Sequence, residues 1–168
     1  MPHSLSQLNA MSQTEFTNTL GPVFEETPAI AARAWQQRPF ESLEALHHCM
    51  VEIVQGMDTD QQLALIRVHP DLGSRAQMAQ ASVNEQAGAG LSQLTAAEYE
   101  RFHQLNQTYR QKFEIPFILA VAGHTKASVL ETFEARLKNS IDKERETALA
   151  EIFKIAAVRL HSWVSTDP

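Results

Sequence analysis

Apolar side chains recur at the 3.6-residue period of an α-helix along most of this chain, and this pattern restricts the possible folds more than any other feature. One apolar stripe lies in Leu43–Val54 and another in about Asp142–Val164. The stretches that follow Thr95 and Thr125 repeat the arrangement. Alternating β-branched residues are scarce, and the 168 residues include only six glycines. The sequence therefore predicts an all-α fold.

Helix-capping residues stand where several of these stripes begin. Asp58 and Gln61 have the spacing of a capping box, in which two side chains satisfy exposed amides at a helix start. Thr95 and Glu98 have the same spacing, and Thr125 precedes the next stripe. We therefore expect separate helices to begin after each of these positions.

The N-terminal third carries weaker signals. Short helical pieces are expected around Leu5–Asn9, Glu15–Leu20 and Ala29–Gln36, and glycine and proline separate them. No repeat, low-complexity stretch or long linker divides the chain. The sequence therefore predicts a single domain, residues 1–168, with about eight helices.

Composition limits the classes of partner. The net charge is −6 and Lys and Arg form no run, so the chain gains nothing from neutralising phosphates. No apolar run approaches the roughly 20 residues that span a bilayer, and the start lacks the pattern of a secretory signal. A single cysteine, Cys49, suggests a reducing compartment. We expect a cytoplasmic protein that binds neither nucleic acid nor membrane.

Polar residues that interrupt the helical pattern are candidates for function, and the first group is 68–73 (VHPDLG). Pro70 disfavours the helical conformation before it, so His69 is expected at a helix C-terminus, where carbonyls favour a cation. A histidine so placed can hold or release a proton near neutral pH. A histidine that only complements the helix dipole fits the same position. Asp71 fits the cap of the following turn.

The second group runs from Ser82 to Leu91. Ser82 and Glu85 have the spacing of a capping box, which alone would explain Glu85. The segment meets Gly88 within one turn, however, and so short a helix repays little of its nucleation cost. Gly88 and Gly90 suit a backbone that bends sharply or lies close to a ligand. Amides at a helix start can hold an anion or a urea-like carbonyl, so a functional role for Glu85 stays open beside the structural one.

The third candidate is Arg159, at the edge of the apolar stripe of the last helix. A guanidinium there must reach solvent, an acidic partner or a ligand. Arginine is also the residue best suited to a planar carboxylate. Both an ion pair and a substrate contact therefore fit Arg159.

The run His47-His48-Cys49 looks like a metal cluster, but adjacent residues on a helix point in different directions. Zinc ligands on one helix need a spacing such as i, i+4, so we expect no metal site here. His47 falls on an apolar stripe and is expected in the core or at an interface. No phosphate-binding glycine loop or dinucleotide fingerprint is present. Three carboxylates are expected on a solvated helix face: Glu144, Glu146 and Glu151.

Together these residues resemble the OHCU decarboxylases, where OHCU is 2-oxo-4-hydroxy-4-carboxy-5-ureidoimidazoline. HPDL at 69–72 followed at this distance by NEQAGAGL at 84–91 is a specific combination. The final helix, with Glu151 and Arg159, agrees as well, and the similarity spans about Leu63 to Val164. Two further stretches carry it: Leu105–Ala120 and Lys126–Leu137.

The resemblance implies an all-α, cofactor-free enzyme that is usually dimeric, so we expect a homodimer without metal or cofactor. It implies that His69 is the catalytic histidine and Glu85 its catalytic partner. The residues expected to bind the small-molecule substrate are Pro70, Ser82, Gln86, Ile118, Leu119, Ala120, Val121, Ala122 and Arg159. Many relatives have Cys-Ala-Arg at 120–122, whereas this chain has Ala-Val-Ala. A side-chain role for that arginine has no counterpart here, but backbone contacts need no particular side chain.

The implied reaction is the decarboxylation of OHCU to (S)-allantoin and CO2, the third step from urate to allantoin. The substrate's own imine can accept the electron pair that CO2 leaves behind, so the chemistry needs no cofactor. His69 is expected to act as general acid and base. Glu85 is expected to orient His69 or to bind the ureido and ring nitrogens.

Three other functions remain compatible with these residues. A catalytically silent binding module could hold a ureido or imidazolone ligand, a metal-dependent hydrolase could use residues 47–49, and an interaction protein could dock a partner on acidic helix faces. The joint presence of His69 and Glu85 favours the decarboxylase, because a binding module needs no proton carrier. Periodicity also leaves open whether Phe117–Ala122 is a strand or a buried helix.

Overall fold

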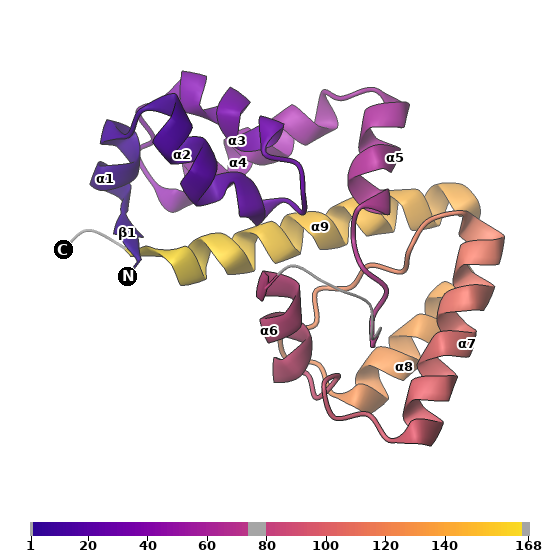
Figure 1. Ribbon diagram of the computed structural model, residues 1–168. Coiled ribbons are helices and arrows are strands. Elements are labelled where there is room, and N and C mark those ends of the chain that lie inside the picture. The colour runs from indigo at the N-terminus through magenta and orange to yellow at the C-terminus, as the bar shows by residue number, and fades with distance from the viewer. Residues whose placement is uncertain (1, 74–79, 166–168) are drawn as a thin grey trace. The chain divides into compact units, whose positions relative to one another are not determined.

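The computed structural model describes residues 2–73 and 80–165, without the side chains of residues 80–82. Within this part the predicted all-α fold is confirmed, with nine α-helices and two short 3₁₀-helices (Figure 1). The helices are α1 Leu5–Ala10, α2 Gln13–Leu20, α3 Ala29–Ala34, α4 Leu43–Gln55, α5 Thr59–Arg67, α6 Gln80–Gly88, α7 Ala96–Phe113, α8 Lys126–Arg136 and α9 Ile141–Trp163, with η1 Gly21–Val23 and η2 Trp35–Gln37. The strands β1 (His3–Ser4) and β2 (Val164–Ser165) form a short parallel pair. No helix of the described chain is long and apolar enough to cross a membrane.

The chain divides into two compact units. The first unit comprises residues 1–65 and 153–168, and the second comprises residues 66–152. The boundary falls inside α9, whose first part belongs to the second unit. The prediction that residues 1–168 form a single domain stays a prediction.

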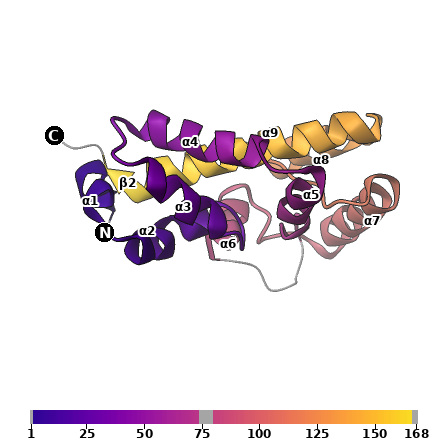
Figure 2. The ribbon, with the colours of Figure 1, turned by 90° about the horizontal axis from the view of Figure 1, so that it is seen from above.

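Aliphatic and aromatic side chains of α1–α4 and of the last part of α9 form the core of the first unit. Leu8, Phe16, Ile30, Leu46 and Leu160 are all completely buried. Figure 2 shows α4 lying along α9, and within this unit the two helices are joined by a hydrogen bond between a histidine of α4 and a backbone carbonyl of α9. The predicted apolar stripe of α4 is therefore the face that packs against the rest of the unit.

Aromatic rings form the centre of the second unit. The rings of Phe117 and Phe133 stack with centroids 3.8 Å apart, and Tyr109 meets both edge-on. Aromatic pairs contribute about 0.5–1.5 kcal/mol beyond the burial of their area. Residues 116–121 have no regular secondary structure, although most of them are buried. This stretch is thus neither strand nor helix, and the packed ring of Phe117 fixes it at one point where a strand would have a backbone ladder.

The structure confirms most of the predicted helix boundaries. Thr95 and Glu98 form the expected reciprocal pair of hydrogen bonds at the start of α7. Asp58 and Gln61 do the same ahead of α5. The capping box predicted at Ser82 is wrong, because the chain is already helical from Gln80. The backbone amides that Ser82 would cap therefore lie inside α6 and not at its start.

Candidate active site

His69 lies two residues beyond the end of α5, as the following proline predicts. Its amide donates to the carbonyl of Ile66 at 3.2 Å, which tightens the last turn. Only 6% of the residue is exposed. A histidine that merely complements a helix dipole needs no such burial, so the position of His69 calls for a further explanation. Pro70 beside it is half-buried.

Two side chains of α7 fix the loop that follows His69. The side-chain Nδ2 of Asn106 donates to the carbonyl of Leu72 at 2.9 Å, and Asn106 is buried. Arg110 Nε lies 2.9 Å from Asp71 Oδ1. The predicted cap of the following turn by Asp71 stays a prediction, since that turn leads into residues outside the described part of the chain. The loop is thus anchored to a helix that is distant in the sequence.

Gln86 joins the two sequence groups that interrupt the helical pattern at 68–73 and at Ser82–Leu91. Its side-chain oxygen accepts a hydrogen bond from the amide of Gly73 at 3.0 Å, and the side chain is buried. Residue 73 lies four positions after His69, and residue 86 adjoins Glu85. Glu85 is half-buried, whereas the two residues before it on α6 are exposed. This hydrogen bond therefore holds the loop of His69 against the helix that carries Glu85.

Gly73 can be only glycine in this arrangement. Its φ is +70°, in the left-handed region. A Cβ there would lie 3.0 Å from Leu94 Cδ1 and 3.2 Å from Phe102 Cγ. The missing side chain therefore lets the loop lie directly against Leu94 and against Phe102 of α7.

In the expected substrate-binding segment 118–122, side chains from other elements form hydrogen bonds with the backbone. Ile118, Leu119 and Val121 are buried, Ala120 is half-buried and Ala122 is exposed. Two side chains anchor this backbone from outside the segment. Arg136 donates to the carbonyl of Ile118, and the amide of Ala120 donates to Glu151 Oε1 at 3.1 Å.

The placement of Glu144 and Glu151 on a solvated face is wrong. Glu144 is completely buried and Glu151 is 6% exposed, whereas Glu146 is exposed as expected. Glu144 is paired with Arg136 Nε at 2.8 Å and accepts a hydrogen bond from the Tyr109 hydroxyl at 2.7 Å. The pattern of α9 alone cannot reveal these partners, which come from α7 and α8.

Burial of Tyr109, reinforced by its hydrogen bond to Glu144, raises the pKa of the tyrosine hydroxyl far above its usual value. The neighbouring Arg136 opposes this effect without cancelling it. Tyr109 thus stays protonated at neutral pH and acts as a hydrogen-bond donor to Glu144.

Arg159 lies in the first unit and has an acidic partner. Its Nη2 is 2.8 Å from Glu25 Oε1, and each residue is 3% exposed. Its Nη1 also donates to the carbonyl of Pro22 at 3.0 Å. The ion pair allowed by the sequence is present, and substrate binding by Arg159 stays a prediction. Ser82 lies on α6, but its side chain is outside the described residues.

The three side chains at 47–49 have separate surroundings. His47 Nε2 lies 2.8 Å from the carbonyl of Phe153, and His48 pairs with Glu52 at 2.9 Å. Cys49 is half-buried, and burial, with a smaller effect from Glu52, raises the pKa of its thiol. Among the residues whose side chains are described, no group of three or more His, Cys, Asp or Glu is placed to hold a metal ion.

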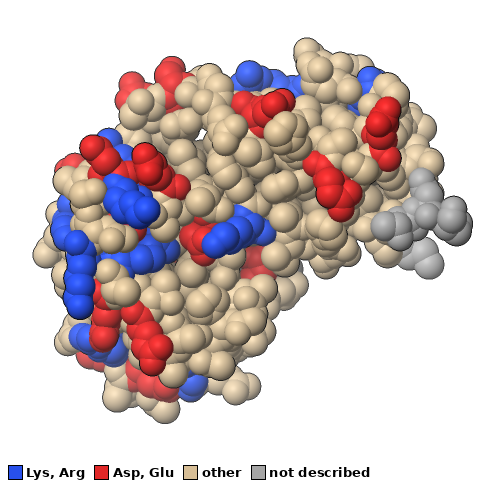
Figure 3. Space-filling model, turned by 180° about the vertical axis from the view of Figure 1, so that it is seen from behind, with Lys and Arg blue, Asp and Glu red and all other residues tan. Residues whose placement is uncertain are grey.

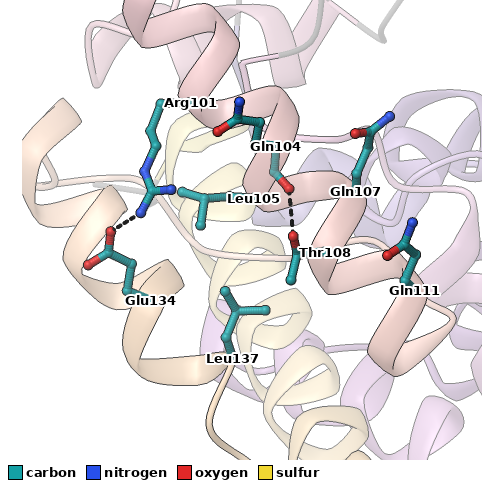
Figure 4. A pocket seen from close by; sticks show the side chains of 8 residues that line it. All are labelled: Arg101, Gln104, Leu105, Gln107, Thr108, Gln111, Glu134 and Leu137. Atoms are coloured by element: carbon teal, nitrogen blue, oxygen red, sulfur yellow. Dashed lines mark hydrogen bonds and ion pairs between the residues drawn. The ribbon is translucent and has the colours of Figure 1, made fainter.

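A shallow hollow of about 490 Å³ lies between α7 and α8. Its lining is mostly polar, and Figure 4 shows Arg101 reaching Glu134 across it. None of the predicted site residues lines it. Figure 3 shows acidic and basic side chains interspersed on one face of the molecule. Neither the hollow nor this distribution of charge points to a particular ligand.

Comparison with known proteins gives consistent results. Residues 9–161 match the model of the family described as OHCU decarboxylase. The chain is 43% identical over 157 residues to a 2-oxo-4-hydroxy-4-carboxy-5-ureidoimidazoline decarboxylase of Halalkalicoccus jeotgali, covering 94% of this chain and 89% of that protein. It is 38% identical to the protein of the same name from Haloferax volcanii, covering 98% of each.

Two solved structures have the same fold. An (S)-allantoin synthase superposes with a TM-score of 0.81 at 30% identity, covering 98% of this chain and 54% of that one. The present chain thus spans about half the length of that protein. An OHCU decarboxylase crystallised in the presence of (S)-allantoin superposes with a TM-score of 0.70 at 21% identity, covering 90% of this chain and 97% of that one.

Proposed function

Because the chain belongs to the OHCU decarboxylase family, we propose that it converts 2-oxo-4-hydroxy-4-carboxy-5-ureidoimidazoline to (S)-allantoin and CO2. The observation that carries the proposal is the hydrogen bond from the Gly73 amide to the Gln86 side chain. This bond ties the loop of His69 to the helix of Glu85, and these are the two sequence groups that most specifically resemble the family.

The substrate dictates what the protein must do. Its C4 carries the carboxylate and a hydroxyl, and C5 forms an imine with a ring nitrogen. When the bond from C4 to the carboxylate breaks, CO2 leaves and the electron pair forms a C4–C5 double bond, while the imine nitrogen takes a proton. The hydroxyl then loses its proton as the C4 carbonyl forms, and C5 takes a proton. Since the substrate accepts its own electrons, the protein needs to supply only binding and proton transfer.

We assign the proton transfers to His69. General acid–base catalysis by a positioned side chain contributes about 10²–10⁴-fold. Burial keeps bulk water away from His69, and the hydrogen bonds of Asn106 and Gln86 hold the loop that follows it. A proton that reaches C5 from a fixed imidazole arrives on one face, which would give one enantiomer of allantoin.

Glu85 is the proposed partner of His69. Its half-buried carboxylate lies on the helix that Gln86 ties to the histidine loop. It would orient the imidazole or bind the ureido and ring nitrogens of the substrate. The substrate-binding set proposed with it is Pro70, Ser82, Gln86 and the backbone of 118–122.

We further propose that the protein acts in the cytoplasm as a homodimer of single-domain subunits. The lone cysteine suits a reducing compartment, and the family resemblance implies the dimer. The net charge of −6 supports a small-molecule substrate rather than a nucleic acid. Light scattering of the purified protein would measure the subunit number directly.

The direct test is time-resolved circular dichroism on urate freshly oxidised and hydrolysed to OHCU, with EDTA present. Rapid appearance of the signal of (S)-allantoin with the protein, and slow racemic product without it, is the expected result. A signal that rises no faster than the spontaneous decay would overturn the proposal and favour a silent binding module.

A further inference from the structure

The connection between α7 and α8 raises a question that the fold alone does not answer. Figure 1 shows it as a long irregular loop, and residues 116–121 in it belong to no helix or strand. Such a loop has no backbone ladder to fix its shape. Its backbone must nevertheless keep one conformation if it is to bind substrate without help from particular side chains.

Two carboxylates of α9 point to how this conformation is kept. Glu144 and Glu151 are seven residues apart, about two helical turns, so they lie on the same face of α9. Ala148, between them on that face, is completely buried. Both carboxylates therefore lie inside the second unit, facing the same region.

The two carboxylates reach neighbouring points of the loop by different routes. Glu144 acts through Arg136, which donates to the carbonyl of Ile118. Glu151 acts directly by accepting the amide proton of Ala120 at 3.1 Å. Residues 118 and 120 are thereby both anchored from the same helix face. A hydrogen bond from an amide to a buried carboxylate is stronger than a neutral one, so the anchor at Ala120 is a firm one.

We propose that Glu151 is a positioning residue that holds the amide of Ala120 and thereby sets the backbone of segment 118–122 for substrate binding. The inference rests on the proposed function, since it assumes that this segment binds OHCU. Glu151 itself does not touch the reacting atoms. Its removal should weaken substrate binding, because a segment that is no longer held in its binding conformation must be ordered by the substrate.

The test compares Glu151→Ala with Glu151→Gln, and uses Glu146→Ala as the control on the exposed side of the same helix. Glutamine keeps an oxygen that can accept the Ala120 amide, whereas alanine does not. We expect Glu151→Ala to raise KM for OHCU about tenfold with little change in kcat, and Glu151→Gln and the control to stay close to the wild type. A KM unchanged in Glu151→Ala, or raised equally in both Glu151 variants, would overturn the inference.

Amide hydrogen exchange at Ala120, followed by NMR, gives a second readout that does not depend on catalysis. Exchange should be slow in the wild type and in Glu151→Gln, and faster in Glu151→Ala. If Glu151→Ala does not fold, Glu151→Asp replaces it, because the shorter side chain keeps the charge and withdraws the acceptor. A wild-type KM in a folded Glu151→Asp variant with fast exchange would overturn the inference. An inactive wild-type protein would instead overturn the proposed function.

Discussion

Each of the two units contains a buried arginine–glutamate pair, but the surroundings of the pairs differ. In the first unit Arg159 and Glu25 join α9 to the chain around η1. In the second unit Arg136 and Glu144 are accompanied by further buried polar side chains, and together they hold two irregular segments, 72–73 and 118–120. Irregular segments carry functional groups more often than helices do. The comparison teaches that the second unit concentrates its buried polar contacts on the backbone that the candidate site needs.

The largest expected effect on stability is shared by the two pairs. Glu144→Leu and Glu25→Leu each remove a carboxylate that is paired with a buried guanidinium, which should lower the free energy of unfolding by about 3–5 kcal/mol. Urea denaturation measures this loss. Only Glu144→Leu should also speed amide exchange at residues 118–120. Equal exchange in both variants would break the comparison.

Loss of the Glu85 charge should affect catalysis more than folding. Glu85→Gln keeps the shape and hydrogen-bonding capacity of the side chain but not its charge. We expect kcat to fall about tenfold or more, with the unfolding midpoint nearly unchanged. Full activity of this variant would favour a purely structural glutamate and weaken the assignment of the site to the second unit.

Gln86 tests the contact between the two sequence groups. Gln86→Met keeps the volume but leaves the Gly73 amide without its acceptor, which should lower the free energy of unfolding by about 1–3 kcal/mol. Gln111→Met, at an exposed position of α7, is the matched control and should change stability little. The same stability for both variants would show that the Gly73 contact contributes nothing.

The smallest expected effect is a pH dependence at the start of α7. The hydrogen bond from the Thr95 amide, helped by Lys126, holds the pKa of Glu98 below its ordinary value. Because the pKa is lower in the folded protein, the stabilisation is present above the ordinary pKa of about 4.5 and is lost as the pH falls through the lowered value. The difference in urea midpoint between wild type and Glu98→Gln should therefore shrink from pH 7 to pH 3. An equal difference at both pH values would contradict this.

Local sequence signals predict most of the helices, because capping and apolar periodicity act within one helix. Leu43–Gln55 and Ala96–Phe113 follow directly from such signals. Glu144 and Glu151 are buried because they pair with Arg136 and with the Ala120 amide. Both partners lie outside α9, so the periodicity of α9 cannot predict this burial. The Ser82 cap is wrong for a related reason, since nothing local shows that the helix is already formed at Gln80.

Some features of the candidate site are likewise predicted by local sequence signals, and others depend on the tertiary fold. Pro70 predicts that α5 ends before His69, but no local pattern predicts that His69 is buried. The interruptions of the helical pattern identified the two sequence groups and the resemblance to the family assigned roles to their residues, while the Gly73–Gln86 hydrogen bond that joins the groups depends on the tertiary fold. Asn106, which holds the histidine loop, was within the similar stretch but gave no signal of its role.

The central claim is that His69 is catalytic rather than structural, and one measurement tests it most directly. His69→Ala and the exposed control His103→Ala are compared with the wild type in the time-resolved circular dichroism assay, with far-ultraviolet spectra recorded on the same samples. We predict that His69→Ala loses about 10²–10⁴-fold in kcat while its helical spectrum and the activity of the control stay unchanged. A His69→Ala protein that is partly unfolded, yet has wild-type activity per folded molecule, would contradict the account.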